Sequence, residues 1–306
     1  MILMNNFKFF STFCFLFLAA SFVAQPTFVE KEKELAYHAD VMVNAAEARH
    51  RVIKIEKFNI LFGEALALSD SYKFPFDSLK WISKKSPKDN SFRIFTWEVK
   101  VSDSDVKNFG ILQKNDGTIF VLTDDIDNAE NLAEEEFSHE NWIGALYYNL
   151  MEGTTASGQP YYLLFGVNRW NNFENVKLID VLFFSKEGKP YFGLPIFKDN
   201  TNADEVKIFN RLAFKYAADA QVSLNYNPGM EMIMVDHLIR KMSRIQGQGE
   251  TLVPDGTYVG YSYKNGYWNK IDKIATEIMD TAPRPKPVLD ERKGMNLNGD
   301  QIKKSK

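Results

Sequence analysis

Residues 211–235 read RLAFKYAADAQVSLNYNPGMEMIMV, and large apolar side chains recur in this stretch at every second position. These positions are Leu212, Phe214, Tyr216, Val222, Leu224, Tyr226, Met230, Met232 and Met234. A period of two is typical of strands that bury one face and expose the other. Because the turn at Asn227-Pro228-Gly229 and the other connection are short, the stretch predicts an antiparallel meander of three strands.

Turn dipeptides extend this β pattern from Phe92 to about residue 280. Each stands between apolar runs, where a hairpin turn is expected. They are Asp116-Gly117, Glu187-Gly188, Pro228-Gly229, Asp255-Gly256 and Asn265-Gly266. Two near-continuous apolar runs, Tyr161–Gly166 and Leu178–Phe184, indicate central strands that are covered on both faces. The sequence therefore predicts a β domain over residues 91–280, either a large sandwich or an open barrel.

Helical periodicity is expected in two places. Residues 28–68 repeat apolar side chains at helical intervals, so the segment 25–90 is predicted to hold one or two helices followed by a packed linker. Asp124 and Asp125 stand where a helix N-cap and first-turn acids belong, which predicts one helix near residues 125–138. The fold class is then mainly β with an α-helical N-terminal segment. A small propeller is the alternative, although no blade-length repeat is visible.

The first 24 residues have the pattern of a secretory signal peptide. Lys8 precedes an apolar run from Phe9 to Val23, and small residues precede Gln25. An uncleaved N-terminal anchor is the alternative. The only cysteine, Cys14, lies inside this run, so the mature chain would have no thiol for disulfides, catalysis or zinc. These features predict a periplasmic or secreted protein that has no transmembrane span once the signal is removed.

Charge and composition limit the classes of partner that the protein is expected to bind. The chain has 37 Lys and Arg against 40 Asp and Glu, a net charge of −3, which does not favour nucleic acid as a partner. Residues 281–306 hold three prolines and an excess of basic residues, which predicts a disordered basic tail.

Motifs for metals and cofactors are weak. Asp124-Asp125-Ile126-Asp127 suggests a calcium loop, but that pattern needs an oxygen ligand at position 129 and glycine at 130, where Ala129 and Glu130 stand. Helix capping explains these acids better. Four scattered histidines and the absence of a glycine-rich dinucleotide motif give no reason to predict a metal or any other cofactor.

Two classes of function remain open for the β domain. Aromatic rings beside amides suit a glycan, a peptide or a partner protein, although most such rings are expected to be core or cross-strand pairs. The candidate ligand-binding residues are Trp170, Asn171, Asn172, Tyr261, Tyr263 and Trp268. The leading hypothesis is a non-enzymatic binding or structural module of the cell envelope. A scaffold component, marked by an exposed strand edge, is a weaker form of it.

The rival hypothesis is a hydrolase that assembles its acid and base from distant residues. Its candidate catalytic residues are Asp180, Asp236, His237 and Glu231. Asp236 and His237 are neighbours in a predicted strand, so their side chains would point to opposite faces unless a bulge intervenes. Two of the carboxyl groups would have to converge within about 5 to 10 Å in a pocket.

Several motifs resemble an uncharacterised family of exported proteins from Bacteroidetes. They are Tyr161–Gly166, Lys177–Leu182, Gly188-Lys189-Pro190, Asp236-His237-Leu238 and Asn265-Gly266-Tyr267-Trp268. The resemblance covers most of the mature chain and implies a compartment rather than an activity. The family usually has Gly-Trp-Asp-Gly-Asn-Asn after its Tyr-Tyr strand, whereas this chain has Gly166-Val167-Asn168-Arg169-Trp170-Asn171-Asn172. Any chemistry of that aspartate would be missing here.

Overall fold

The computed structural model describes residues 27–202, 205–272 and 274. The predicted signal peptide and the predicted tail at 281–306 lie outside these residues. Two helices come first, α1 at Phe28–Asn44 and α2 at Ala48–Ala67, as the sequence predicts. Helix α1 begins with a capping box, in which the Thr27 side chain accepts from the Glu30 backbone and the Glu30 side chain accepts from the Thr27 backbone.

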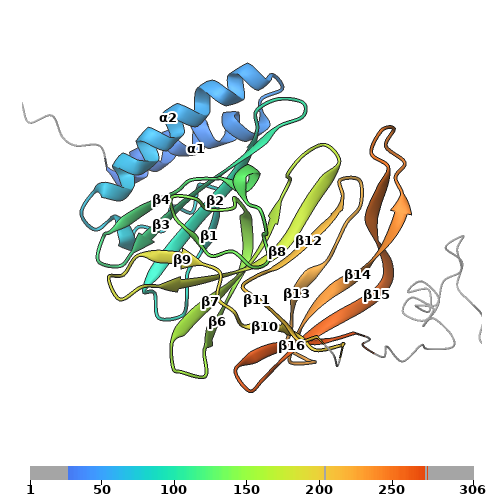
Figure 1. Ribbon diagram of the computed structural model, residues 1–306. Helices are drawn as coiled ribbons and strands as arrows, with labels where there is room; N and C mark the ends of the chain where they lie inside the picture. Colours follow the sequence, from blue (N-terminus) through green and yellow to red (C-terminus); the bar gives the residue numbers. More distant parts are fainter. Residues whose placement is uncertain (1–26, 203–204, 273, 275–306) are drawn as a thin grey trace, which may run out of the picture.

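Three sheets follow the helices (Figure 1). The first has the order β1 (Ser83–Lys85), β2 (Phe92–Lys100), β3 (Val106–Lys114) and β4 (Ile119–Leu122). The middle sheet has the order β5 (Phe137–Ser138), β9 (Pro190–Phe192), β8 (Glu174–Phe184), β7 (Pro160–Asn168) and β6 (Leu146–Thr154), and β12 (Leu212–Ala217) also pairs with β8. The third has the order β11 (Lys207–Phe209), β10 (Phe197–Asp199), β16 (Tyr267–Ile271), β15 (Glu250–Lys264), β14 (Met232–Met242) and β13 (Leu224–Asn227). All strand pairs of the described residues are antiparallel except β10 with β16.

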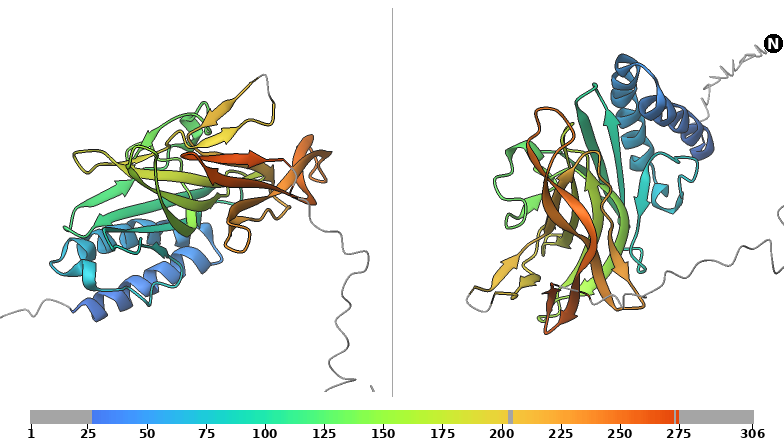
Figure 2. Two further views of the ribbon diagram at one scale, coloured as in Figure 1. Left: turned by 90° about the horizontal axis from the view of Figure 1, so that it is seen from below. Right: turned by 90° about the vertical axis from the view of Figure 1, so that its right-hand side faces the viewer.

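The helices and the three sheets stack as four layers (Figure 2). Strand β2 shows how the alternation of side chains joins the first layers. Phe95, Trp97 and Val99 pack against the helices, whereas Phe92 and Ile94 face the middle sheet. Both faces of β2 are thus buried.

The middle sheet is also covered on both faces, which confirms the prediction from its two apolar runs. In β7, Tyr162 and Leu164 belong to the core shared with the first sheet. Leu163 and Phe165 belong to the core shared with the third sheet. The described sheets stay open, and none closes into a barrel. The fold is an α+β sandwich of layers.

One predicted strand partner is wrong. Strand β12 does not continue into a meander with β13 but pairs with β8, opposite Glu174–Ile179. Short strand β9 covers only Leu182–Phe184 of that same edge. Because an unpaired edge in a buried sheet leaves backbone groups unsatisfied, β12 fills the rest of the edge. Strands β13 and β14 do pair antiparallel across the Asn227-Pro228-Gly229 turn as predicted, and β15 pairs with the other edge of β14.

The predicted helix at 125–138 is also wrong. The segment has one 3-10 turn at Ile126–Asn128 and then an irregular loop before β5. Its backbone groups are used by distant partners: the Asp125 amide donates to the Trp142 carbonyl, and the Asn210 and Arg211 amides both donate to the Ala133 carbonyl. These tertiary hydrogen bonds replace the helical ones.

Four of the five turn dipeptides join adjacent strands as predicted, and Asp255-Gly256 does not. It lies inside β15, opposite a register shift between Asp236 and Leu238 in β14. Between these pairs His237 alone stands opposite Asp255, Gly256 and Thr257, so the extra residues of the bulge are in β15. His237 Nδ1 lies 2.8 Å from Asp255 Oδ2. Hydrogen bonds from Thr257, and then from His237, lower the pKa of Asp255 to about 2. The dipeptide therefore forms a bulge inside the long β14–β15 pair, and it is not the turn of a hairpin.

None of the helices formed by the described residues has the length and apolar character needed to cross a membrane.

Candidate functional site

Trp170 lies in the connection between β7 and β8, with its indole ring partly buried. The indole Nε1 donates a hydrogen bond of 3.2 Å to Asp127 Oδ1. Lys215 of β12 places its Nζ 3.9 Å from the centroid of the ring, a cation–π contact. The ring is therefore fixed by two charged side chains from distant parts of the sequence.

A cleft of about 390 Å³ opens beside this ring. Most of its wall is apolar, and polar groups stand among the apolar ones. Its lining is Ile126, Ala129, Glu130, Asn131, Leu132, Ala133, Trp170, Ala213, Lys215 and Leu252. An apolar concave surface with a few polar groups is typical of a small-ligand site. We call it the Trp170 cleft.

A second, smaller pocket of about 130 Å³ shares Trp170 and Ile126 with this cleft. Its remaining lining is mostly polar: Asp105, Val106, Lys107, Asn108, Asp124, Asp125, Asp127, Asn128 and Asn168. Four of these side chains are carboxylates and one is a lysine. We call it the acidic pocket.

Asp124 is a half-buried carboxylate of the acidic pocket. Its Oδ2 accepts hydrogen bonds of 3.2 Å from both the backbone and the side-chain nitrogen of Asn108. Burial raises the pKa of Asp124, although these hydrogen bonds act in the opposite direction. Gly144 packs directly on the carboxylate: its φ is +57°, and a Cβ there would lie 2.4 Å from Asp124 Cγ.

Of the predicted ligand-binding residues, only Trp170 lines one of these two sites. Asn171 follows it, but its Oδ1 accepts from the backbone nitrogens of Phe173 and Glu174 and so shapes the loop. Asn172 is exposed in the same loop and lines neither site.

The other three predicted aromatic residues lie elsewhere. Tyr261 and Trp268 are buried in the core between the middle and third sheets, and Trp268 Nε1 donates to the Tyr161 hydroxyl. Tyr263 is 43% exposed and donates its hydroxyl to the Thr154 carbonyl. These contacts are at the start of β7, whereas Trp170 follows its end. The two ends of this nine-residue strand are roughly 26 Å apart at about 3.3 Å per residue. The predicted ligand-binding residues therefore do not form a single cluster.

A third concave surface combines tyrosine rings with amides. It is an open groove of about 430 Å³ lined by Ser223, Asn225, Tyr226, Asn227, Pro228, Met234 and Tyr258. Its amides already have structural partners. Asn225 Oδ1 accepts from Asn149, and Asn227 Oδ1 accepts from the backbone nitrogens of Gly229 and Met230. Two amide oxygens of this groove are therefore occupied by structural hydrogen bonds.

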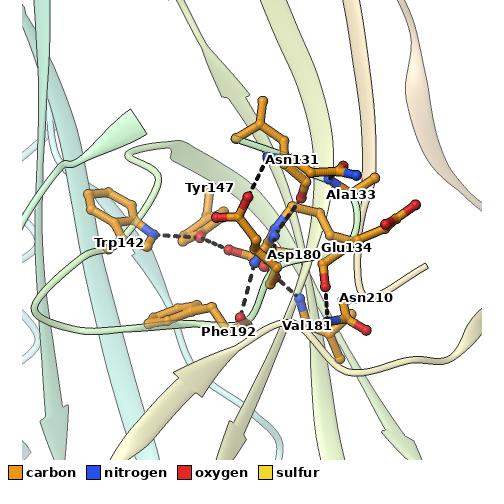
Figure 3. Close-up of polar contacts among 12 residues, drawn as sticks. Asn131, Ala133, Glu134, Trp142, Tyr147, Asp180, Val181, Phe192 and Asn210 are labelled. Carbon is orange, nitrogen blue, oxygen red and sulfur yellow. Dashed lines mark hydrogen bonds and ion pairs between the residues drawn. The ribbon is translucent and has the colours of Figure 1, made fainter. Parts of the chain in front are cut away.

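Asp180, the first predicted catalytic residue, is completely buried in β8. Arg211 Nε donates to its Oδ1 at 2.8 Å, and the Tyr147 hydroxyl donates to its Oδ2 at 3.0 Å. Trp142 Nε1 in turn donates to the Tyr147 oxygen at 2.8 Å (Figure 3). Burial, together with the charge of Asp180, raises the pKa of Tyr147 well above its usual value, so its hydroxyl stays a donor.

The position of Asp180 explains why a charge is buried there. Along β8 it lies between the residues that pair with β9 and those that pair with β12. Arg211 spans this break, because its Nη2 donates to the Phe192 carbonyl and its Nη1 to the carbonyls of Leu132 and Glu135. The ion pair therefore joins two strands to the loop that carries Leu132, which is a wall of the Trp170 cleft.

The remaining predicted catalytic residues lie apart from Asp180. Asp236 Oδ2 accepts from the Ser223 backbone, His237 pairs with Asp255 in the bulge, and Glu231 is exposed in a turn with a φ of +52°. None of the four lines the Trp170 cleft, the acidic pocket or the groove of Tyr226 and Tyr258. The convergence of carboxyl groups that a hydrolase needs is not found among them.

No family model, curated protein or solved structure matches the chain. Among the described residues, no three His, Cys, Asp or Glu side chains gather closely enough to hold a metal by themselves.

Proposed function

We propose that the protein is an exported, non-catalytic binding protein of the bacterial envelope, and that it binds an oligosaccharide in the Trp170 cleft. The observation that carries this proposal is the indole ring itself. It lines both the apolar cleft and the acidic pocket, and Asp127 and Lys215 fix its position. A preorganised ring loses little conformational freedom when a ligand binds to it.

The chemistry of a sugar ring matches this lining. A pyranose has an apolar C–H face that can pack on an aromatic ring, and hydroxyl groups at its edge. Ile126, Leu132 and Trp170 offer the apolar surface. The nearest polar partners for hydroxyl groups are Glu130, Asn131 and Lys215.

A binding role is favoured over hydrolysis because the candidate acids have other partners. Asp180 is paired with Arg211 away from solvent, and Asp236 closes the ladder between β13 and β14. The Trp170 cleft has Glu130 as its only carboxylate, so a pair of acids for general acid–base hydrolysis is missing from its lining.

Replacing Trp170 with alanine is expected to weaken oligosaccharide binding by about tenfold or more, since an aromatic contact contributes about 1 kcal/mol beyond the area that it buries. The measurement is a glycan array followed by titration calorimetry with the best ligand. Trp81 offers a matched control, because it is 47% exposed and its Nε1 also donates to a carboxylate, Asp40, at 3.1 Å. Trp81→Ala should bind like the wild type.

Three outcomes would count against the oligosaccharide. One is a folded wild-type chain that binds no glycan on the array, and another is equal binding by the wild type and Trp170→Ala. If the chain binds an apolar peptide instead of a glycan, and Trp170→Ala abolishes that binding, the cleft is a binding site but its ligand is a peptide.

The proposed export of the protein is tested separately from its binding. In bacterial cells that express the full chain, the mature protein is expected to begin at Gln25 and to appear in the periplasmic or extracellular fraction. Mass spectrometry of the N-terminal peptide measures this directly. Recovery of residues 1–24 on a membrane-bound chain would show an anchor instead.

A further inference from the structure

We propose that the acidic pocket behind Trp170 is a calcium site built from buried amide and carboxylate oxygens. This inference does not depend on the oligosaccharide proposal. The sequence argues against a calcium loop that is continuous from Asp124 to Glu130. The structure adds Asn108 and Asn168 to the same pocket, from β3 and the end of β7.

Asn168 supplies a spare oxygen that is completely buried. Its Nδ2 donates to the carbonyls of Ile143 and Gly144 at 3.1 and 2.7 Å, whereas its Oδ1 has no hydrogen-bond partner. The two carbonyls fix the amide orientation, because a flip would place the oxygen against both of them. Since Asn168 lines the pocket and its nitrogen is engaged with these carbonyls, its oxygen is the polar atom left for the pocket.

Asn108 supplies a second oxygen of the same kind. It is 4% exposed, its Nδ2 donates to Asp124 Oδ2, and its Oδ1 has no hydrogen-bond partner. The carboxylate fixes this amide as well, because a flip would set oxygen against oxygen. Buried polar atoms in folded proteins nearly always have a hydrogen-bond partner, so two unpaired amide oxygens among residues of one pocket indicate a missing partner.

The missing partner must supply positive charge or hydrogen-bond donors. Asp105, Asp124, Asp125 and Asp127 line the pocket with a single lysine, Lys107, whose Nζ is 3.8 Å from Asp105. The donors present are already used: the Asn128 amide donates to Asp125, and the Trp170 indole donates to Asp127. The spare capacity therefore consists of acceptors, which favours a cation.

Calcium fits this set of oxygens better than magnesium does. Ca²⁺ accepts six to eight oxygen ligands in irregular geometry, including Asn carbonyls, carboxylates and waters, whereas Mg²⁺ demands a near-ideal octahedron. A pocket of about 130 Å³ has room for an ion with several waters. Because amides replace some carboxylates, we expect a dissociation constant on the order of 10⁻⁴ to 10⁻³ M, as in extracellular calcium modules.

The test is titration of the folded chain with CaCl₂, MgCl₂ and methylammonium chloride, each followed by calorimetry. Terbium(III) gives a second readout, since Trp170 lines the pocket and can sensitise the luminescence of a bound lanthanide. Asp124→Asn removes the buried charge, and Asn108→Ala removes one amide oxygen but keeps the backbone bond to Asp124. Asp77→Asn is the charge-matched control, because Asp77 is exposed and does not line the pocket.

We expect one Ca²⁺ to bind more tightly than Mg²⁺, and each pocket variant to weaken it by about tenfold or more. Asp77→Asn should bind like the wild type. The proposal is overturned if the folded wild type binds no Ca²⁺ at millimolar concentration, or if both folded pocket variants bind it unchanged. Binding of methylammonium without Ca²⁺ would also overturn it.

Discussion

Replacing Arg211 with methionine is expected to lower the free energy of unfolding by about 3 to 5 kcal/mol, because it leaves the Asp180 carboxylate buried without its counter-charge. Neither side chain has any exposed surface, so water cannot replace the lost partner. The variant also loses the hydrogen bonds from Arg211 to the carbonyls of Phe192, Leu132 and Glu135. Since Leu132 lines the Trp170 cleft, we expect the cleft wall to loosen as well.

Denaturant unfolding measures the loss of stability in Arg211→Met, and two control variants show whether it comes from the buried charge. Arg240→Met removes an exposed arginine that lies 3.9 Å from Glu250, and it should change stability little. The double variant Asp180→Leu with Arg211→Met should recover part of the loss, since it removes both buried charges. A loss below about 1 kcal/mol in Arg211→Met would show that Asp180 is not the buried, paired charge described above.

Truncating Phe62 to alanine is expected to destabilise the fold by about 3 to 5 kcal/mol, the usual cost of removing a buried aromatic ring. Phe62 of α2 is completely buried and contacts the rings of Phe58, Phe76, Phe95 and Trp97. Because these rings come from both the helical segment and β2, the cavity would lie between two layers.

Ile60 provides the matched control for Phe62. It lies in the same helix but is 52% exposed, so Ile60→Ala should change stability by less than about 1 kcal/mol. Thermal and denaturant unfolding of both variants give the comparison. If Phe62→Ala were as stable as Ile60→Ala, the helices would not share a core with the first sheet.

Local patterns predicted the elements whose partners are near in sequence. The alternation in β13 and β14, the continuous apolar runs of β7 and β8, and the turn at Asn265-Gly266 all depend on neighbouring residues. The predicted helix at 125–138 and the predicted pairing of β12 with β13 were wrong because residues distant in the sequence determine both segments. They are decided by Arg211 and by the free edge of β8, which no local pattern reveals.

The candidate site could be predicted only in part. Trp170 stood out as an aromatic residue beside amides, but its partners Asp127 and Lys215 are separated from it by about 45 residues in either direction. From the sequence alone, the charge run that includes Asp127 predicts helix capping. Asp180 is a candidate acid in the sequence because nothing near it reveals a partner. The partner, Arg211, is 31 residues away along the chain.

The most direct test of the binding site is a crystal structure of the mature chain with the best oligosaccharide from the array. We predict electron density for a sugar ring against Trp170, with hydroxyl groups within hydrogen-bond distance of Glu130, Asn131 or Lys215. A sugar seated in the groove of Tyr226 and Tyr258, with the Trp170 cleft filled only by water, would contradict the account.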